Sequence, residues 1–258
     1  LSKYLLFDEH GRCIPDKVSS DVYKESRRYF VVPRVKVKIE NVYNNIKNHL
    51  DPKTDLSLKE FKNRTLKILN DLNSDPLSLN ITKGMGVPFF LPKSKTIDMG
   101  KELINKYIAA LEKSFKEENP KYEFSNFCTE DLTDKLKVVQ DSRHQILIDA
   151  MENDNIVGYY FPCLLEYSVP AAIERIKSLP INFLLAGAFD TFSAFIGTPN
   201  LLLRHDGYPP LLWMTGIEGE KDYAGYHIEA YGYNLNFNRR PHHGNAAEYW
   251  AHGLVVLG

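Results

Sequence analysis

Cysteine is scarce in this sequence of 258 residues. Only Cys13, Cys128 and Cys163 occur, far apart and never as a Cys-x-x-Cys pair. Three cysteines at these separations fit neither a disulfide framework nor a structural zinc site. We therefore expect reduced thiols, no disulfide and a cytoplasmic, reducing environment. The sequence begins at Leu1 and not at methionine, which leaves translocation to another compartment open.

An excess of either charge is also missing. The 32 lysines and arginines stand against 33 aspartates and glutamates, which gives a net charge of −1. Because no overall field favours an anionic polymer, we expect no nucleic-acid partner. The basic residues between Arg34 and Lys38 alternate with valines, as on the solvent face of a strand. We expect a strand over Tyr29–Ile39, at a sheet edge because Pro33 has no N–H to donate.

No apolar run is long enough for a membrane span. The longest, from Ile181 to Gly197, has 17 residues with Asp190 in its middle, whereas a bilayer needs about 20 apolar residues. We therefore expect a buried helix over Ile181–Ile196 and no membrane partner. A buried carboxylate without a partner is costly, so Asp190 should have a hydrogen-bond donor nearby.

The strong catalytic and cofactor motifs are absent: the sequence has no G-x-S-x-G, H-E-x-x-H, Walker or EF-hand pattern. Gly84-Met-Gly86 is half of a dinucleotide fingerprint, but Pro88 falls where the helix should begin, so no nucleotide cofactor is expected. His227-Ile-Glu229 lacks the downstream cysteines of the zinc deaminases. The cofactor is therefore unknown, with a divalent metal left open.

Helical and strand-like patterns divide the chain unevenly. Ser57 to Glu60 is a capping box ahead of an apolar stripe, and residues 98–118 repeat apolar positions at helical spacing. After residue 198 short strand-like runs alternate with turns. We predict an α+β fold, with helices from about 1–180 packed on a mixed or antiparallel sheet and a β-rich part from about 198–258. No linker separates the parts, so a single domain over 1–258 is expected.

The tail is rich in residues that carry chemistry. Five of the eight histidines and both tryptophans lie after residue 200. On a strand over 226–234, alternate side chains share one face, and this face makes His227, Glu229 and Tyr231 the candidate catalytic residues. A metal bound by two histidines and a carboxylate needs His227, Glu229 and one more ligand. The candidates for that ligand are His242, which we prefer, His243 and His252. The alternative is the polar outer face of an antiparallel sheet.

Basic and aromatic residues beside these strands form a candidate ligand site. Arg239, Arg240, His242 and His243 lie in one turn, where guanidinium and imidazole groups suit a phosphate or carboxylate. Trp213 would add an aromatic wall. A solvated turn held by its proline and glycine is the alternative interpretation.

Two functions remain from the sequence. The first is an enzyme or binding protein for a small polar or anionic molecule held between the tail strands and residues 84–92; whether it is an enzyme stays open. The second is a non-catalytic interaction or effector-type module with an exposed aromatic surface. That surface would consist of Phe89, Phe90, Leu91 and Trp213. The substrate, the reaction and the oligomeric state are not specified by the sequence.

Overall fold

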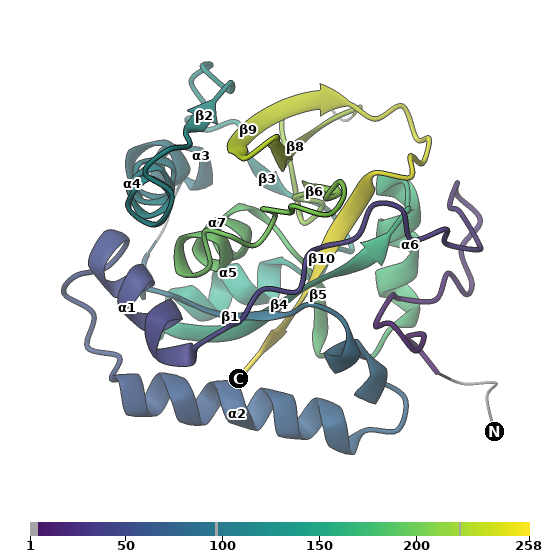
Figure 1. Cartoon of the computed structure of the whole chain (residues 1–258), viewed down its shortest axis with the longest axis horizontal. Helices are drawn as coiled ribbons and strands as arrows, with labels where there is room; N and C mark the ends of the chain where they lie inside the picture. Colours follow the sequence, from purple (N-terminus) through teal and green to yellow (C-terminus); the bar gives the residue numbers. More distant parts are fainter. Residues whose placement is uncertain (1–4, 96–97, 222) are drawn as a thin grey trace.

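A mixed sheet of eight strands forms the centre of the protein (Figure 1). The structure is a computed structural model that describes residues 5–95, 98–221 and 223–258. The predicted α+β class is confirmed, and the last five strands lie in the predicted β-rich tail. The strands in their order across the sheet are β1 (Val87–Leu91), β4 (Ile156–Leu165), β10 (Trp250–Leu257), β6 (Leu211–Trp213), β8 (Ala224–Tyr231), β9 (Asn234–Pro241) and β2 (Phe124–Asn126), while β5 (Phe183–Leu185) pairs with β10.

Most neighbouring strands run antiparallel. The β10–β6 and β2–β9 pairs are parallel, which makes the sheet mixed. All ten residues of β4 are buried, as expected for a strand that is covered on both faces. A separate two-stranded ribbon joins β3 (Lys137–Val138) to β7 (Ile217–Glu218).

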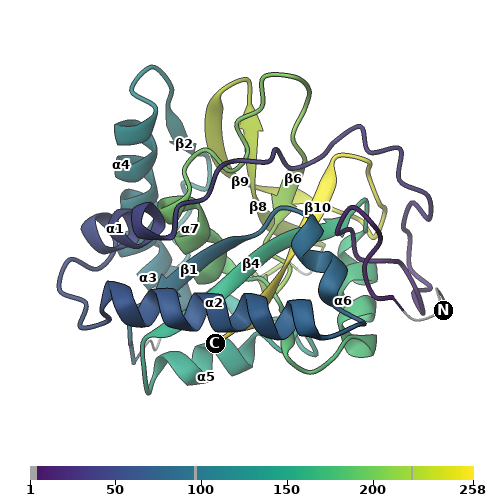
Figure 2. The same ribbon diagram turned by 60° about the horizontal axis from the view of Figure 1, so that its bottom comes forward.

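Helices cover both faces of the sheet. The long helix α2 packs along β4, and Figure 2 shows it lying across β1 and β4. Helices α1, α4 and α7 gather at the other side (Figure 1). The predicted cap of α2 is present, since Ser57 Oγ accepts from the Glu60 N–H at 3.1 Å. The helices are α1 (Ile39–His49), α2 (Leu58–Ser74), α3 (Met99–Glu102), α4 (Ile108–Glu118), α5 (Gln145–Met151), α6 (Val169–Ser178) and α7 (Ala188–Gly197), with a 3₁₀ turn η1 (Leu79–Lys83) and a π turn η2 (Leu103–Tyr107).

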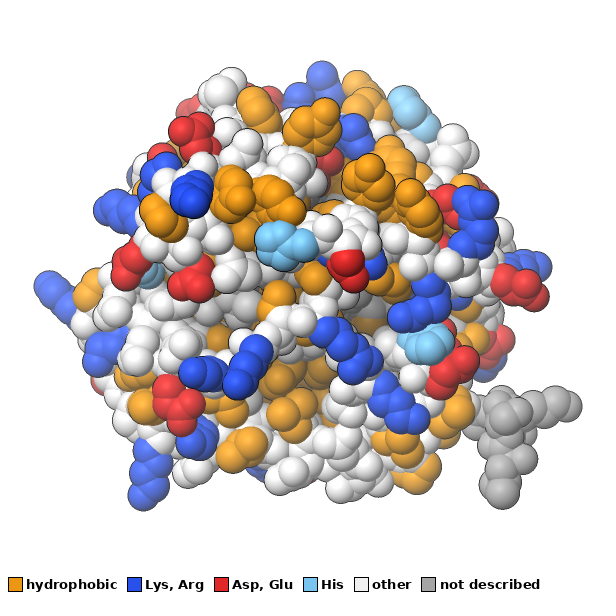
Figure 3. Space-filling model, viewed as in Figure 1, with side chains coloured by type: hydrophobic (Ala, Val, Ile, Leu, Met, Phe, Trp, Pro, Cys, Tyr) orange, Lys and Arg blue, Asp and Glu red, His pale blue; other side chains and the backbone are white. Residues whose placement is uncertain are grey.

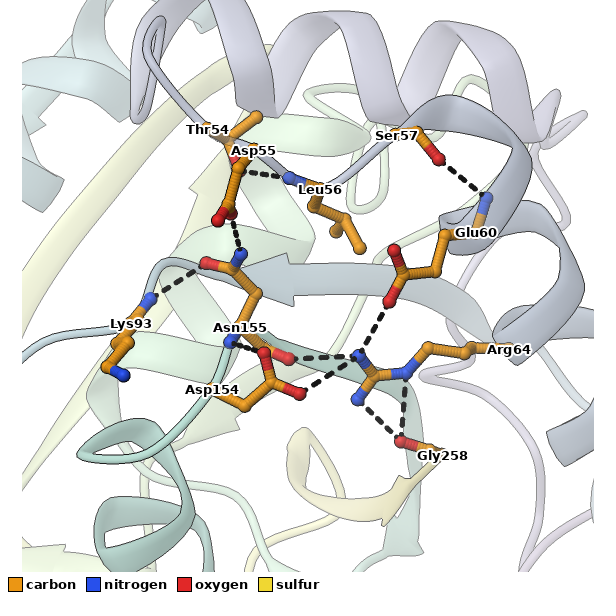
Figure 4. Close-up of polar contacts among 10 residues, drawn as sticks. All are labelled: Thr54, Asp55, Leu56, Ser57, Glu60, Arg64, Lys93, Asp154, Asn155 and Gly258. Carbon is orange, nitrogen blue, oxygen red and sulfur yellow. Dashed lines mark hydrogen bonds and ion pairs between the residues drawn. The ribbon is translucent and has the colours of Figure 1, made fainter.

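One arginine of α2 ties three segments together (Figure 4). The guanidinium of Arg64 donates to the Gly258 carbonyl, from Nε at 3.1 Å and from Nη2 at 2.7 Å. Its Nη1 donates to the Asn155 carbonyl at 3.1 Å and lies 3.6 Å from Glu60. Helix α2, the start of β4 and the end of β10 are thereby held in one place.

The apolar run that we predicted to be one helix is divided into a strand and a helix. Phe183–Leu185 pairs with β10, and α7 begins only at Ala188, while Ile181 is 71% exposed. The division falls at Gly187, where an added Cβ would lie 2.4 Å from Nε2 of His144. The whole of α7 is buried, as predicted. Within the described residues, no helix has both the length and the apolar character to cross a bilayer.

Asp190 has the predicted hydrogen-bond partner. Its side chain is fully buried, and the Gly187 N–H donates to Oδ1 at 3.0 Å and to Oδ2 at 3.1 Å. Burial raises the pKa of the carboxyl, while His144 and the Gly187 N–H favour its charged form. Asp190 therefore caps the first turn of α7 from inside the core.

Replacement of Asp190 should destabilise the protein through this cap. In Asp190→Ala the buried Gly187 N–H loses its acceptor, so we expect the free energy of unfolding to fall by about 1–3 kcal/mol. Asp190→Asn keeps an acceptor oxygen and should lose clearly less. Denaturant unfolding of the three proteins measures the difference, and equal stability of Asp190→Ala and the unmodified protein would refute the role.

The strand predicted over Tyr29–Ile39 is wrong. Residues 31–38 form an extended segment without regular secondary structure, and only Phe30 makes a single bridge, to Tyr208. The burial pattern still alternates, because Val35 and Val37 pack on the core while the basic side chains between them are exposed. The alternation reports an extended backbone and not strand pairing. We call residues 31–38 the basic strap.

All three cysteines are free and buried. Burial raises the pKa of each thiol, that of Cys128 to about 12. The prediction of no disulfide is therefore confirmed. A thiol that stays protonated in an apolar environment is a poor nucleophile, so these cysteines serve packing.

Candidate functional site

His227 and Trp213, two of the predicted site residues, lie on one face of the sheet formed by β10, β6, β8 and β9. Strand register places His252, Trp213, His227 and Asn238 in one row across the four strands. His227 and Glu229 share this face, with Nε2 of the imidazole 3.5 Å from Oε1 of the carboxylate. The pleat therefore directs these two side chains to the same side, as expected.

The middle of this face is a buried cluster of rings with unpartnered nitrogens. Trp213 contacts His227 with ring centroids 5.2 Å apart and Trp250 with centroids 5.0 Å apart. Apart from the Glu229 carboxylate 3.5 Å from its Nε2, the His227 ring has no hydrogen-bond partner among the described residues, and Nε1 of neither tryptophan has one there. Burial lowers the pKa of His227, so its imidazole is held in the neutral form. The proximity of His227 lowers the pKa of Glu229.

The other predicted site residues point in several directions. Tyr231 is 81% exposed at the end of β8, and Arg239 forms an ion pair with Glu130. Arg240 lies over the Tyr249 ring at 5.9 Å. The charge of Arg240 acts on both His227 and Glu229, so this arginine lies near the His227 cluster.

The two histidines of the turn that was predicted to bind a ligand, His242 and His243, lie in different surroundings. His242 lies 6.0 Å from Trp213, and with that ring it lines a pocket of about 310 Å³. His243 is exposed and stacks on Tyr223 with ring centroids 6.0 Å apart. The turn therefore presents two imidazoles to different surroundings.

A metal centre is not assembled at these residues. Over residues 5–95, 98–221 and 223–258, no group of three or more histidine, cysteine, aspartate or glutamate side chains could hold a metal ion. The predicted set of His227, Glu229 and His242 thus does not come together. His252 uses both ring nitrogens inside the protein, because Nε2 donates to the Tyr167 carbonyl at 2.9 Å and Nδ1 lies 2.5 Å from Thr215 Oγ1.

The aromatic surface of the alternative function is not exposed. Phe89, Phe90 and Leu91 belong to the buried strand β1, and Trp213 is 1% exposed. Residues 87–91 are therefore a core strand.

A larger cavity lies elsewhere, along the basic strap. It has a volume of about 960 Å³, and neither His227 nor Glu229 lines it, contrary to expectation. Its walls are the strap, Gly84 and Met85 before β1, part of β4, the ends of α4 and α7, and the tail residue Tyr233. Figure 3 shows a hollow on this face with lysine and arginine side chains along its border. We call this cavity the basic cleft.

Cations outnumber carboxylates around the basic cleft. Two of the arginines are neutralised within the protein: Arg12 pairs with Glu166 at 3.2 Å and Arg204 with Asp206 at 2.8 Å. The remaining four cations belong to the strap and to the chain just before it. The charged lining comprises Arg12, Arg28, Arg34, Lys36, Lys38 and Arg204, against Glu118 and Asp206.

A second wall of the cleft is polar and carries one carboxylate, Glu118. Asn119 and Thr198 are the residues that cap the C-terminal ends of α4 and α7, and Asn200 donates from Nδ2 to Glu118 at 3.2 Å. In the described part of the chain, Asn119 Nδ2, Thr198 Oγ1 and Asn200 Oδ1 are buried atoms without a hydrogen-bond partner.

An aromatic column stands beside this polar wall. Tyr233 lies between Tyr122 and His205, with ring centroids 5.0 and 4.9 Å apart. Its hydroxyl is 2.8 Å from His205 Nδ1. Sequence reasoning missed this cleft because its walls come from distant segments; the one local signal was Pro33, which prevents regular pairing of the strap.

Comparison with known proteins gives no match, whether to family models, to curated proteins or to solved structures. The function must therefore be inferred from the residues themselves.

Stability should depend on pH through His252. Burial lowers its pKa from 6.5 to about 4, so between these values the unfolded chain binds a proton that the folded chain does not. Stability is therefore lost as the pH falls from about 6.5 to 4, by roughly 3 kcal/mol for this group. His252→Gln, which can donate to Tyr167 and accept from Thr215 without titrating, should flatten the curve. Denaturant unfolding at several pH values tests this, and an unchanged slope would contradict it.

Proposed function

We propose that this protein binds a small anionic molecule in the basic cleft. The observation that carries the proposal is the unequal charge of the walls of a cavity of about 960 Å³. Pockets of about 300–1,000 Å³ are typical of small-molecule sites. After the internal pairs of Arg12 and Arg204 are set aside, four cations face one carboxylate, Glu118.

The strap suits an anion for two reasons. Val35 and Val37 of its extended backbone pack on the core, while Lys36 and Lys38 stay exposed and line the cleft. Lysine and arginine form charge-assisted hydrogen bonds with phosphate and carboxylate that are stronger than neutral ones. Apolar walls such as Val42 and Leu203 concentrate the field of these cations within the cavity.

The basic cleft coincides with the ligand site expected from the sequence only at one edge. Tyr233 and His205 come from the tail, and Gly84 and Met85 from the segment that was expected to form the opposite wall. A contribution of His227 and Glu229 remains a second proposal, which is supported by the unpartnered nitrogens of the His227 cluster.

Removal of the strap charges should weaken anion binding. For Lys36→Gln/Lys38→Gln we expect affinity for inorganic pyrophosphate to fall about tenfold or more, because two charge-assisted contacts are lost. Isothermal titration calorimetry at fixed ionic strength measures the change. Both lysines are exposed, so the variant should fold normally.

The matched control is Lys59→Gln/Lys113→Gln, which removes two exposed lysines from outside the cleft lining. An equal loss in this control, or no loss in the strap variant, would disprove binding at the strap. Tryptophan emission separates the two proposals, because Trp213 and Trp250 are the only tryptophans and both contact the His227 cluster. If pyrophosphate changes the tryptophan emission and its affinity is the same in Lys36→Gln/Lys38→Gln as in the unmodified protein, the anion binds at the His227 cluster and not at the strap.

A further inference from the structure

We infer that the ligand of the basic cleft is dipolar, with a phosphate group at the strap and an ammonium group at the polar wall. This inference rests on the proposed anion binding and adds the chemistry of the ligand's other end. The class is an amino phosphate, in which the two charges are separated by a short chain.

Two helices end at the polar wall with their negative poles. Helix α4 ends at Glu118 and α7 at Gly197, and the next residues, Asn119 and Thr198, both line the cleft. The C-terminal end of a helix carries a partial negative charge because its last carbonyls lack intrahelical partners. At the end of α7 the Ile196 carbonyl accepts from Ser114 Oγ at 2.7 Å and the Gly197 carbonyl from Asn45 Nδ2 at 3.2 Å. The remaining dipole of the two helix ends disfavours a second anionic group at this wall.

Glu118 adds a full negative charge to the same wall. Of the two carboxylates in the lining, Asp206 is neutralised by Arg204, whereas Glu118 accepts only the neutral amide of Asn200, at 3.2 Å. Within the described residues, no lysine, arginine or histidine forms an ion pair with Glu118. A ligand ammonium would supply the missing cation.

Unpartnered oxygens provide evidence that is independent of the helix ends. Thr198 is 8% exposed, and its Oγ1 has no hydrogen-bond partner in the described chain. Oδ1 of Asn200, a half-buried residue, also has no partner there. An ammonium group has three N–H donors and no acceptor, so it can satisfy several oxygens together. Asn119 Nδ2, an amide donor of the wall without a partner in the described chain, can bond to an ester oxygen of the ligand.

The aromatic column adds a surface that favours cations. Tyr122 and Tyr233 lie beside Asn119 in the lining, and the face of a tyrosine ring attracts an ammonium group. Lys36 and Lys38 line the same cleft. Because the lining carries both the cationic strap and the Glu118 carboxylate, a ligand with an anion alone would leave Glu118 without a counter-charge.

The test uses pairs of probes that differ only in the amine. Binding of 2-aminoethyl, 4-aminobutyl and 6-aminohexyl phosphate is compared with that of ethyl, butyl and hexyl phosphate by calorimetry. We expect the amine to improve affinity about tenfold at one chain length, since an ion pair and a cation–π contact are gained together. Because the walls have a fixed separation, shorter or longer chains should gain less.

The charge of Glu118 is tested with an isosteric variant. Glu118→Gln should abolish most of the preference for the amine and leave the affinity for alkyl phosphates unchanged or higher. The matched control is Glu117→Gln, an exposed neighbour that pairs with His49 and does not line the cleft. The control should keep the full preference.

The outcomes separate this inference from the proposed function. Equal affinity of amino and plain phosphates at every length, or an amine preference that survives in Glu118→Gln, would overturn the dipolar ligand. Anion binding at the strap would still stand if Lys36→Gln/Lys38→Gln weakens both probe families. Failure of all six phosphates to bind would overturn the inference together with the anion site.

Discussion

The burial of β4 on both faces is the constraint on which the rest of this structure depends. A ten-residue strand between β1 and β10 must be covered by apolar groups above and below. Helix α2 packs along it, and α7 packs on its neighbour β1. Near Pro162, Cys163 and Leu165 the cover on one side is the basic strap. The basic cleft exists because a single extended segment fills less volume than a helix.

The parts that the sequence predicts well are those in which one local pattern decides the structure. The Ser57 cap needs only residues three positions apart, and it is present in the structure. The division at Gly187 could not be predicted, because it depends on the ring of His144, 43 positions earlier in the chain. The prediction of a strand over Tyr29–Ile39 was wrong for a related reason. Alternation specifies which side chains face inward, but strand pairing also needs the edge of a neighbouring strand.

The tail illustrates how far pleating alone can locate a site. It correctly gave His227 and Glu229 a common direction, yet Trp213 packs on the imidazole, which is fully buried. The site roles of His227, Glu229 and Tyr231 stay predictions. The basic cleft was invisible to the same method because Lys36, Asn119 and Thr198 are each ordinary in their own segment. Only the fold brings a cationic segment to face two helix ends.

The net charge of −1 argues against a protein-wide electrostatic field that would attract nucleic acid. The same argument does not apply to a small anionic ligand, as the basic cleft shows. Charges act over about 10 Å at ordinary ionic strength, so a polymer responds to the sum over a surface whereas a small molecule responds to one cavity. Salt acts on both ends of such a ligand, because Lys36, Lys38 and Glu118 are all exposed. Hydrogen bonds to the buried Thr198 are screened much less. Added salt therefore weakens the two ionic contacts together, and the part of the preference for an amine that depends on Thr198 persists.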